Sequence, residues 1–371
     1  MTGAAKAVGS VPATLAASRA RDFHPGWYGA VMGTAVVGIV AYQNPGGIAA
    51  LASAGRALGV AMVALSALLA LALGIPYMAR WLRHPAAALA DFANPALGGL
   101  YGTFPGGLLV LALGIATVGP SAADGASLTP AVLALALVGS VLAFAISVTF
   151  TVQLVLRAGV EPSLANGAWF IPPVVTIIIP VVLAALAPHV GPADLPALSA
   201  LGYAFFGMGL LLFLLVASLF YDRLVFHPLP GAPLAPSIWI GLGPVGVGSL
   251  ALLRLSATSA GVWGDAAPAV TAASAVGATA LWGLGLWWLA ASIALLAAYL
   301  RRGGLPFGVG WWGFTFPLGA FTAGTVAIAR AWHAGWLEAL GALLFAGLCV
   351  AWTAVALRTA AAVRSGEAWR R

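Results

Sequence analysis

The side chains that could perform acid–base or metal chemistry are few, and they lie outside the apolar segments. The chain of 371 residues contains nine Asp and Glu residues, all in tails, loops or helix ends. They are Asp22, Asp91, Asp124, Glu161, Asp194, Asp222, Asp265, Glu338 and Glu367. Proton relays and cation pathways use acidic groups inside the membrane. The pattern therefore disfavours a cation pump and a proton-coupled exchanger.

The remaining reactive side chains do not form a catalytic or metal-binding motif either. The histidines fall at helix ends without metal-ligand spacing: His24, His84, His189, His227 and His333. Cys349 is the only cysteine and lies in an apolar segment, so no internal disulfide forms. We predict no metal site, no cofactor and no catalytic residues. An intramembrane enzyme is the least supported function, because it needs such a group within the membrane.

The polar groups expected at mid-membrane depth are hydroxyls. Thr34 and Thr315 are candidates for lining a passage, and Gly33 beside Thr34 would leave space there. A hydroxyl can donate a hydrogen bond to an anion without carrying a fixed charge. Most such hydroxyls bond back to a carbonyl of their own helix instead. Both interpretations stay open for each residue.

A motif in which aromatic residues come shortly before a proline recurs along the chain. The prolines are Pro105, Pro173, Pro244 and Pro317, spaced by 68, 71 and 73 residues. A proline within a helix removes one hydrogen bond and kinks the chain. The segment GWYGAVMGTAVVG has the aromatic residues and glycines but no proline. A fixed period indicates repeated units, here a helical hairpin of about 70 residues used five times.

Two phenylalanines directly precede these prolines. Phe316 precedes Pro317 near the expected bilayer centre, and Phe104 precedes Pro105 at the equivalent place. A hydrophobic side chain at a constriction is able to gate a pore. Spacing alone gives the gate and simple packing equal weight for Phe316, and favours packing for Phe104.

These motifs must be positioned by membrane-spanning helices. The chain is 62% hydrophobic and only 7% charged, far below the roughly 25% charged residues of soluble domains. About 20 apolar residues are needed for each span. The sequence predicts ten spans: 27–43, 58–80, 98–118, 131–156, 167–187, 199–220, 237–254, 273–300, 308–329 and 335–358.

The distribution of basic residues predicts the orientation. With ten spans, 13 of the 16 Lys and Arg residues fall on the side that holds both termini. By the positive-inside rule this side is cytoplasmic. We expect a cytoplasmic tail over 1–22, a transmembrane channel domain over 23–358 and a cytoplasmic tail over 359–371, in the cell membrane. The net charge of +7 is then a topology signal and does not indicate nucleic-acid binding.

The predicted fold is an all-α polytopic membrane protein built from five helical hairpins. The first helix of each hairpin carries the aromatic and glycine-rich motif, and four of these also carry the proline. The second helix is rich in Leu and Ala. The simplest arrangement gathers five kinked helices in an inner ring around a pore, with five outer helices facing lipid. Arg254 and Arg330 would end two inner helices at the outer side. They either snorkel to the interface or attract anions to the mouth.

The whole chain resembles the tellurite-resistance/dicarboxylate transporter family, which includes slow anion channels, malate transporters and sulfite exporters. The resemblance rests on FHPGWYGAVMGTAVVG, WFIPPV, APSIWIGLGPVGVGSLAL and WWGFTFPLGAF. It implies a homotrimer with a separate pore in each protomer. It also implies that Phe316 occludes that pore.

These features predict a membrane channel or transporter for small anions, such as sulfite, malate and other C4-dicarboxylates, or monovalent anions. The alternative is a coupled secondary exporter, for sulfite or tellurite efflux. We expect membrane lipid and the transported anion as partners, and no nucleic acid.

Overall fold

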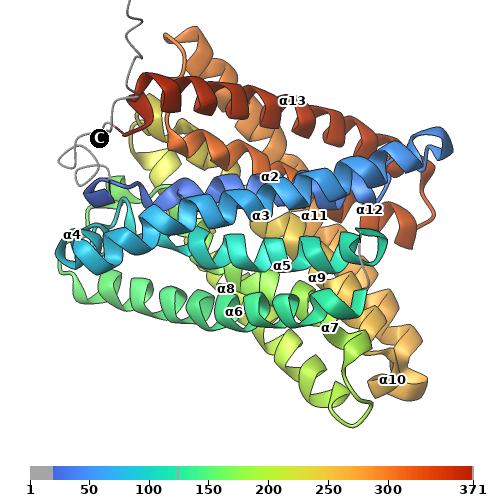
Figure 1. The fold of residues 1–371 in the computed structure, drawn as a ribbon. Coiled ribbons are helices and arrows are strands. Elements are labelled where there is room, and N and C mark those ends of the chain that lie inside the picture. Colours follow the sequence, from blue (N-terminus) through green and yellow to red (C-terminus); the bar gives the residue numbers. More distant parts are fainter. Residues whose placement is uncertain (1–19, 123–124, 370–371) are drawn as a thin grey trace, which may run out of the picture.

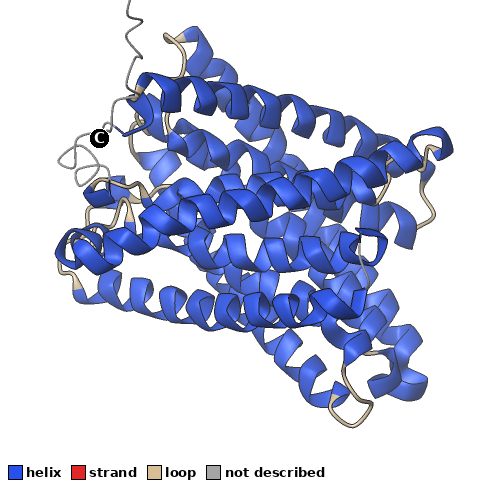
Figure 2. Ribbon diagram, viewed as in Figure 1, coloured by secondary structure: helices blue, strands red, loops and turns tan. Residues whose placement is uncertain are grey.

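The computed structural model describes residues 20–122 and 125–369, and all the regular elements of these residues are helices (Figures 1 and 2). The α-helices are α2 (Tyr28–Tyr42), α3 (Ala52–Arg83), α4 (Pro85–Phe92), α5 (Thr103–Ala122), α6 (Gly125–Leu156), α7 (Ile171–Leu186), α8 (Leu195–Phe226), α9 (Leu242–Thr258), α10 (Ala260–Trp263), α11 (Ala267–Arg301), α12 (Thr315–Ala331) and α13 (Gly335–Ser365). The tail predicted over 1–22 lies mostly outside the described residues.

Nine stretches of the described residues are long and apolar enough to cross a membrane, which confirms a polytopic helical membrane protein. They are 49–83, 98–120, 128–156, 167–189, 195–226, 232–258, 260–301, 309–331 and 335–365. Each corresponds to one of the ten predicted spans. The remaining predicted span corresponds to α2, whose 15 residues follow directly on a short 3-10 helix.

Burial alternates along the chain. In the spans that contain α5, α7, α9 and α12, between 67% and 89% of the most apolar window is buried. The corresponding share is only 17–28% for the spans that contain α3, α6, α8, α11 and α13. Nearly every residue of α2 is buried too. Five helices thus lie inside the protein, and five present large apolar side chains outward.

Helix contacts follow the same division. Each outer helix packs against the inner helix that precedes it, giving the pairs α2–α3, α5–α6, α7–α8, α9–α11 and α12–α13. The inner helices also contact one another in succession, from α2 to α5, α7, α9 and α12, and α12 contacts α2. Figure 1 shows the long helices running side by side, with α4 and α10 at opposite ends of the bundle.

Every inner helix begins with a 3-10 segment. These segments are η1 (Pro25–Trp27), η3 (Gly98–Gly102), η5 (Gly167–Phe170), η7 (Ala232–Gly241) and η9 (Val309–Phe314), and each runs directly into its α-helix. The sequence predicted a kink at a proline inside a continuous helix. The structure instead places Pro105, Pro173, Pro244 and Pro317 at the third residue of α5, α7, α9 and α12. The first-turn N–H groups have no intrahelical partner, so a proline is tolerated there.

Two glycines allow the inner helices α9 and α12 to approach closely. A Cβ atom at Gly246 would lie 2.4 Å from the backbone nitrogen of Phe321. A Cβ atom at Gly324 would lie 2.8 Å from the carbonyl oxygen of Gly246. The backbones therefore touch at a place where no larger residue fits. Small residues are common at such helix contacts in membranes.

Candidate functional site

A cavity of about 850 Å³ enters the protein among the 3-10 segments of the inner helices. All five segments contribute to its wall, through Gly26, Leu100, Ala168, Ser237 and Gly310 among others. Residues at both ends of the described chain also line it, so it lies at the end of the bundle where the chain enters and leaves. The repeat that the sequence shows as aromatic–proline motifs therefore surrounds one common space.

The cavity reaches into the α-helical parts of the inner helices. There its wall is formed by Met32 of α2, Val174 of α7, and Phe316 and Pro317 of α12. Phe316 is only 6% exposed. Its ring faces α9, where a Cβ atom at Gly243 would lie 3.7 Å from Phe316 Cε1. Phe316 thus lies at the inner part of the cavity and packs across the space between α12 and α9.

The helices are tightly packed beyond Phe316. Its successors in α12, from Leu318 to Val326, are all buried. The hydroxyls there are satisfied locally: Thr322 donates to the carbonyl of Leu318 at 2.7 Å, and Thr325 donates to that of Phe321 at 2.8 Å. Back-bonding to the same helix is therefore the observed arrangement for these hydroxyls, as is usual for Ser and Thr in helices.

Other predicted pore residues lie between helices and do not line this cavity. Gly33 lies against α12, where an added Cβ atom would meet the side chain of Thr315 at 2.0 Å. The Thr315 hydroxyl donates to the carbonyl of Trp312 at 2.8 Å. Thr34 accepts a hydrogen bond of 3.1 Å from Trp352 Nε1 of the outer helix α13.

Phe104 and three of the prolines are also absent from the cavity wall. Phe104 stacks on Tyr77 of α3, with ring centroids 4.5 Å apart and planes 6° apart, and meets Tyr28 edge to face at 4.7 Å. This contact with an outer helix agrees with the packing interpretation of Phe104. The wall includes Pro317 but not Pro105, Pro173 or Pro244.

The cavity mouth contains residues that sequence reasoning did not single out. Asp22 and His24 line it from the N-terminal side, and Glu367 lines it from the short 3-10 helix η10 (Glu367–Trp369). Trp369 packs on Phe23 and on Trp27, with ring centroids 6.5 and 5.7 Å apart. The two ends of the described chain therefore meet at the mouth. This contact joins residues more than 340 positions apart, so the sequence gives no local signal for it.

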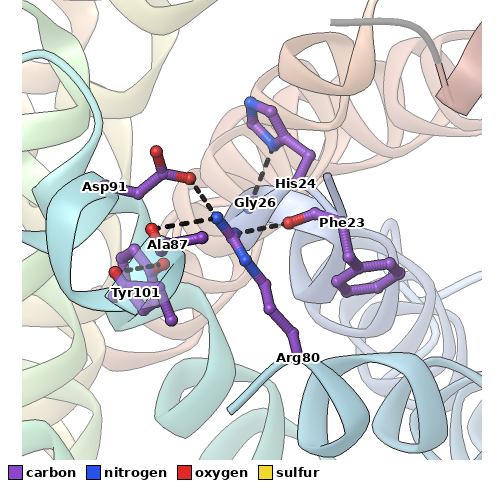
Figure 3. A network of polar contacts seen from close by, with 8 residues as sticks. Phe23, His24, Gly26, Arg80, Ala87, Asp91 and Tyr101 are labelled. Carbon is purple, nitrogen blue, oxygen red and sulfur yellow. Dashed lines mark hydrogen bonds and ion pairs between the residues drawn. The ribbon is translucent and has the colours of Figure 1, made fainter. Parts of the chain in front are cut away.

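A buried arginine holds the N-terminal side of the mouth in place (Figure 3). Arg80, near the end of α3, donates to the carbonyl of Phe23 at 2.6 Å and forms an ion pair with Asp91 of α4. Its side chain is 3% exposed and that of Asp91 is 19% exposed. His24 Nδ1 accepts a hydrogen bond of 3.1 Å from the backbone N–H of Gly26. The segment that carries Asp22 and His24 is therefore fixed from both sides.

We expect Arg80→Gln to destabilise the protein by about 3 kcal/mol, because it removes one partner of a buried ion pair and the charged donor to the carbonyl of Phe23. The measurement is the midpoint of thermal unfolding in detergent, followed by tryptophan fluorescence. Arg83→Gln, on the exposed side of the same helix end, is the matched control and should leave the midpoint nearly unchanged. Equal midpoints for both variants would contradict a holding role for Arg80.

The two predicted mouth arginines lie at the opposite end of the bundle and differ from each other. Arg330 pairs with Glu338 at 2.8 Å and donates to the carbonyl of Gln43 at 2.6 Å. Arg254 is exposed near the end of α9. Among the described residues, no carboxylate lies within ion-pair distance of Arg254. Arg330 therefore joins α12 to the start of α13, whereas the charge of Arg254 is uncompensated.

Within residues 20–122 and 125–369, no group of three or more His, Cys, Asp or Glu side chains is placed to hold a metal ion. The structure contains an open cavity of about 850 Å³ at the ends of the buried helices of a multi-pass protein. Such a cavity is a common feature of channels and transporters.

Comparison with known proteins identifies the family. Residues 22–360 match the model of the SLAC1 family, described as voltage-dependent anion channel, and the chain belongs to this family. The chain is 27% identical to an uncharacterized transporter of Methanocaldococcus jannaschii over 353 residues, covering 94% of this chain and 96% of the relative. It is 27% identical to the sulfite efflux pump SSU1 of Trichophyton rubrum, covering 90% and 89%. It is 25% identical to the malic acid transport protein of Schizosaccharomyces pombe, covering 51% and 44%.

These relatives confirm the family resemblance read from the sequence motifs. They are transporters and channels, not enzymes, and the chain shares nearly its full length with several of them. The protein is therefore an anion transporter of the SLAC1 family.

Proposed function

We propose that this protein is an anion channel that passes small anions through a pore within each protomer. Candidate anions are sulfite, malate and other C4-dicarboxylates, and monovalent anions. The observation that carries the proposal is the cavity of about 850 Å³, walled by the 3-10 segments of all five inner helices and also lined by Phe316. A transport pathway needs such an entry, centred on the helices that are buried from lipid.

The pathway would run along the axis of an inner ring of five helices: α2, α5, α7, α9 and α12. Their successive contacts and deep burial support this ring, and α3, α6, α8, α11 and α13 would form the outer ring. Ten spans, with α2 as the first, would return the chain to the side on which it began. The stacking of Trp369 on Phe23 supports an even number of spans.

Anion preference follows from the helix ends around the cavity. The inner helices direct their N-terminal ends toward it, and the N-terminal end of a helix carries partial positive charge. The deep wall is otherwise uncharged, with Met32, Val174 and Phe316. Weak, uncharged sites suit conduction, because an ion must be able to leave them.

Phe316 would be the gate of this pore. It is buried at the deep part of the cavity, it faces α9 across Gly243, and it directly precedes Pro317 in the first turn of α12. Movement of the ring away from Gly243 would extend the cavity toward the buried residues of α12 that follow Pro317, and these would have to separate from α9 to complete a passage. A hydrophobic constriction of this kind blocks ions until it opens.

Arg254 would attract anions to the opposite mouth. We expect Arg254→Gln to lower anion flux about twofold at low salt, because one uncompensated positive charge is lost, and to lose this effect at high salt. The measurement is flux into liposomes at two ionic strengths. Arg56→Gln is the control, since Arg56 is exposed on the outer helix α3 near the same end. A salt-independent loss, or an equal loss in the control, would rule out an electrostatic role for Arg254.

Reconstitution tests the proposed function directly. Purified protein in liposomes should pass radiolabelled sulfite, malate or chloride down a gradient, faster than liposomes without protein. If none of the three anions passes in wild type or in a gate variant, the proposed function is wrong.

A coupled secondary exporter is the second candidate, and the sulfite efflux pumps among the relatives favour it. Tellurite would be a further cargo to test in that case. Flux against an anion gradient that depends on the proton gradient would favour the exporter over the passive channel.

We further propose a homotrimer in the cell membrane with both chain ends in the cytoplasm. The exposed Leu-rich faces of the outer helices suit contact with lipid and with neighbouring protomers. The cavity mouth would then open to the cytoplasm. Chemical crosslinking in detergent and accessibility of a terminal tag in intact cells would test these assignments.

A further inference from the structure

The mouth of the cavity carries two acidic side chains, and negative charge repels anions. Asp22 and Glu367 both line the cavity, and carboxylates are negative at neutral pH. The described residues of the wall include no Lys or Arg. An anion that leaves or enters through this mouth therefore passes two like charges before it reaches the positive ends of the helices.

Both carboxylates belong to segments that the fold holds in place. Asp22 precedes Phe23, whose carbonyl accepts a hydrogen bond of 2.6 Å from Arg80. Glu367 follows Gly366, which adopts a left-handed backbone conformation with φ of 78° and turns the chain back at the end of α13. Stacking of Trp369 on Phe23 and Trp27 then fixes η10 against the N-terminal segment. Neither charge is therefore free to swing far from the mouth.

The described wall contains one other titratable side chain, that of His24. His24 lines the cavity, and its Nδ1 accepts a hydrogen bond from the N–H of Gly26 at 3.1 Å. Asp22 and Glu367 are thus the two carboxylates of the described wall, and they make the potential there more negative than the neighbouring Arg21 and Arg364 alone would.

The two carboxylates lie at or beyond the ends of the segment that matches the family model. The family match begins at residue 22 and ends at residue 360, so Glu367 and the segment that holds it lie beyond it.

A fixed negative potential discriminates among anions by their charge. The local concentration of an ion depends exponentially on its charge. A potential that halves the local concentration of a monovalent anion therefore reduces that of a divalent anion about fourfold. We propose that Asp22 and Glu367 form a charge filter that admits monovalent anions and disfavours divalent ones. The transported form of an acid such as sulfite or a dicarboxylate is then its singly charged form. This inference rests on the proposed function.

The test compares the fluxes of a monovalent and a divalent anion in liposomes. Radiolabelled chloride and sulfite are measured at about pH 8.5, where sulfite is divalent, and at low salt, where charges are little screened. The proteins are wild type, Asp22→Asn, Glu367→Gln and the double variant, each also in a Phe316→Ala background. We expect the sulfite-to-chloride flux ratio to rise about twofold for each single variant and about fourfold for the double variant. The gain should largely disappear at high salt.

Glu161→Gln provides the matched control. Glu161 is an exposed carboxylate that precedes the short helix η4 (Pro162–Leu164) and does not line the cavity. The sulfite-to-chloride flux ratio of the Glu161→Gln variant should equal that of wild type. If chloride and sulfite pass but the double variant leaves their ratio unchanged at low salt, the charge filter is wrong while the proposed function stands. If no protein passes either anion, the proposed function fails and the filter fails with it.

Discussion

Phe316→Ala should raise anion flux about tenfold or more, because it removes the aromatic ring from the deep wall of the cavity. The ring now fills the space between α12 and Gly243 of α9. An alanine leaves that space open to water and ions, while the proline and the helix start remain. The measurement is uptake of radiolabelled chloride, sulfite and malate into liposomes that contain equal amounts of folded wild type and variant.

Phe314→Ala is the control for this experiment, since Phe314 belongs to the same aromatic motif. Its ring meets those of Trp239 and Trp311 edge to face, with centroids 5.4 and 6.0 Å apart, and it does not line the cavity. Its flux should stay close to that of wild type. A folded Phe316→Ala protein with unchanged or slower flux would show that Phe316 only packs the interior.

Gly246→Ala should destabilise the protein by about 3 kcal/mol, because the added methyl group would overlap the backbone of the neighbouring helix. The new Cβ atom would lie 2.4 Å from the backbone nitrogen of Phe321 and 2.5 Å from the carbonyl carbon of Ala320. Backbone atoms cannot rotate away as a side chain does, so α9 and α12 must separate. The thermal unfolding midpoint in detergent should fall clearly.

Gly283→Ala in α11 is the matched substitution for Gly246→Ala. A Cβ atom at Gly283 would meet nothing within 4 Å, and alanine favours a helix more than glycine does. Its midpoint should therefore equal or slightly exceed that of wild type. If both variants melt like wild type, α9 and α12 do not approach as closely as described.

The sequence predicted the membrane segments well because length and apolar character alone decide them. Nine predicted spans correspond to long apolar helices, and the predicted span 27–43 corresponds to the shorter helix α2. The repeat also indicated which helices lie inside, since the four segments with the aromatic–proline motif are buried, as is α2, which has the aromatic residues and glycines without the proline. Phe316 was identified by its place before Pro317, and it does line the cavity.

Local helix geometry was harder to predict. A 3-10 segment and an α-helix share the same apolar composition, so the five 3-10 segments gave no separate signal, and the prolines were interpreted as kinks. The direction in which each side chain points could not be predicted from the sequence either. Thr34 and Gly33 are adjacent, yet one meets α13 and the other α12. Only the packing of the helices shows that neither lines the cavity.

The acidic mouth could not be predicted, because it depends on contacts between distant parts of the chain. Asp22 and Glu367 each resemble an ordinary polar residue in a terminal segment. Their common location follows from Arg80, which holds Phe23, and from Trp369, which stacks on it. Neither interaction leaves a pattern in the sequence.

The packing of Trp369 against Phe23 and Trp27 has a practical consequence for transport assays. A purification handle or fluorescent reporter fused after the last residues would emerge beside the entrance to the cavity. A polyhistidine handle there would add titratable groups next to Asp22 and Glu367, and a bulky reporter would obstruct access. Transport rates and ion preferences are therefore best compared on protein from which such fusions have been cleaved.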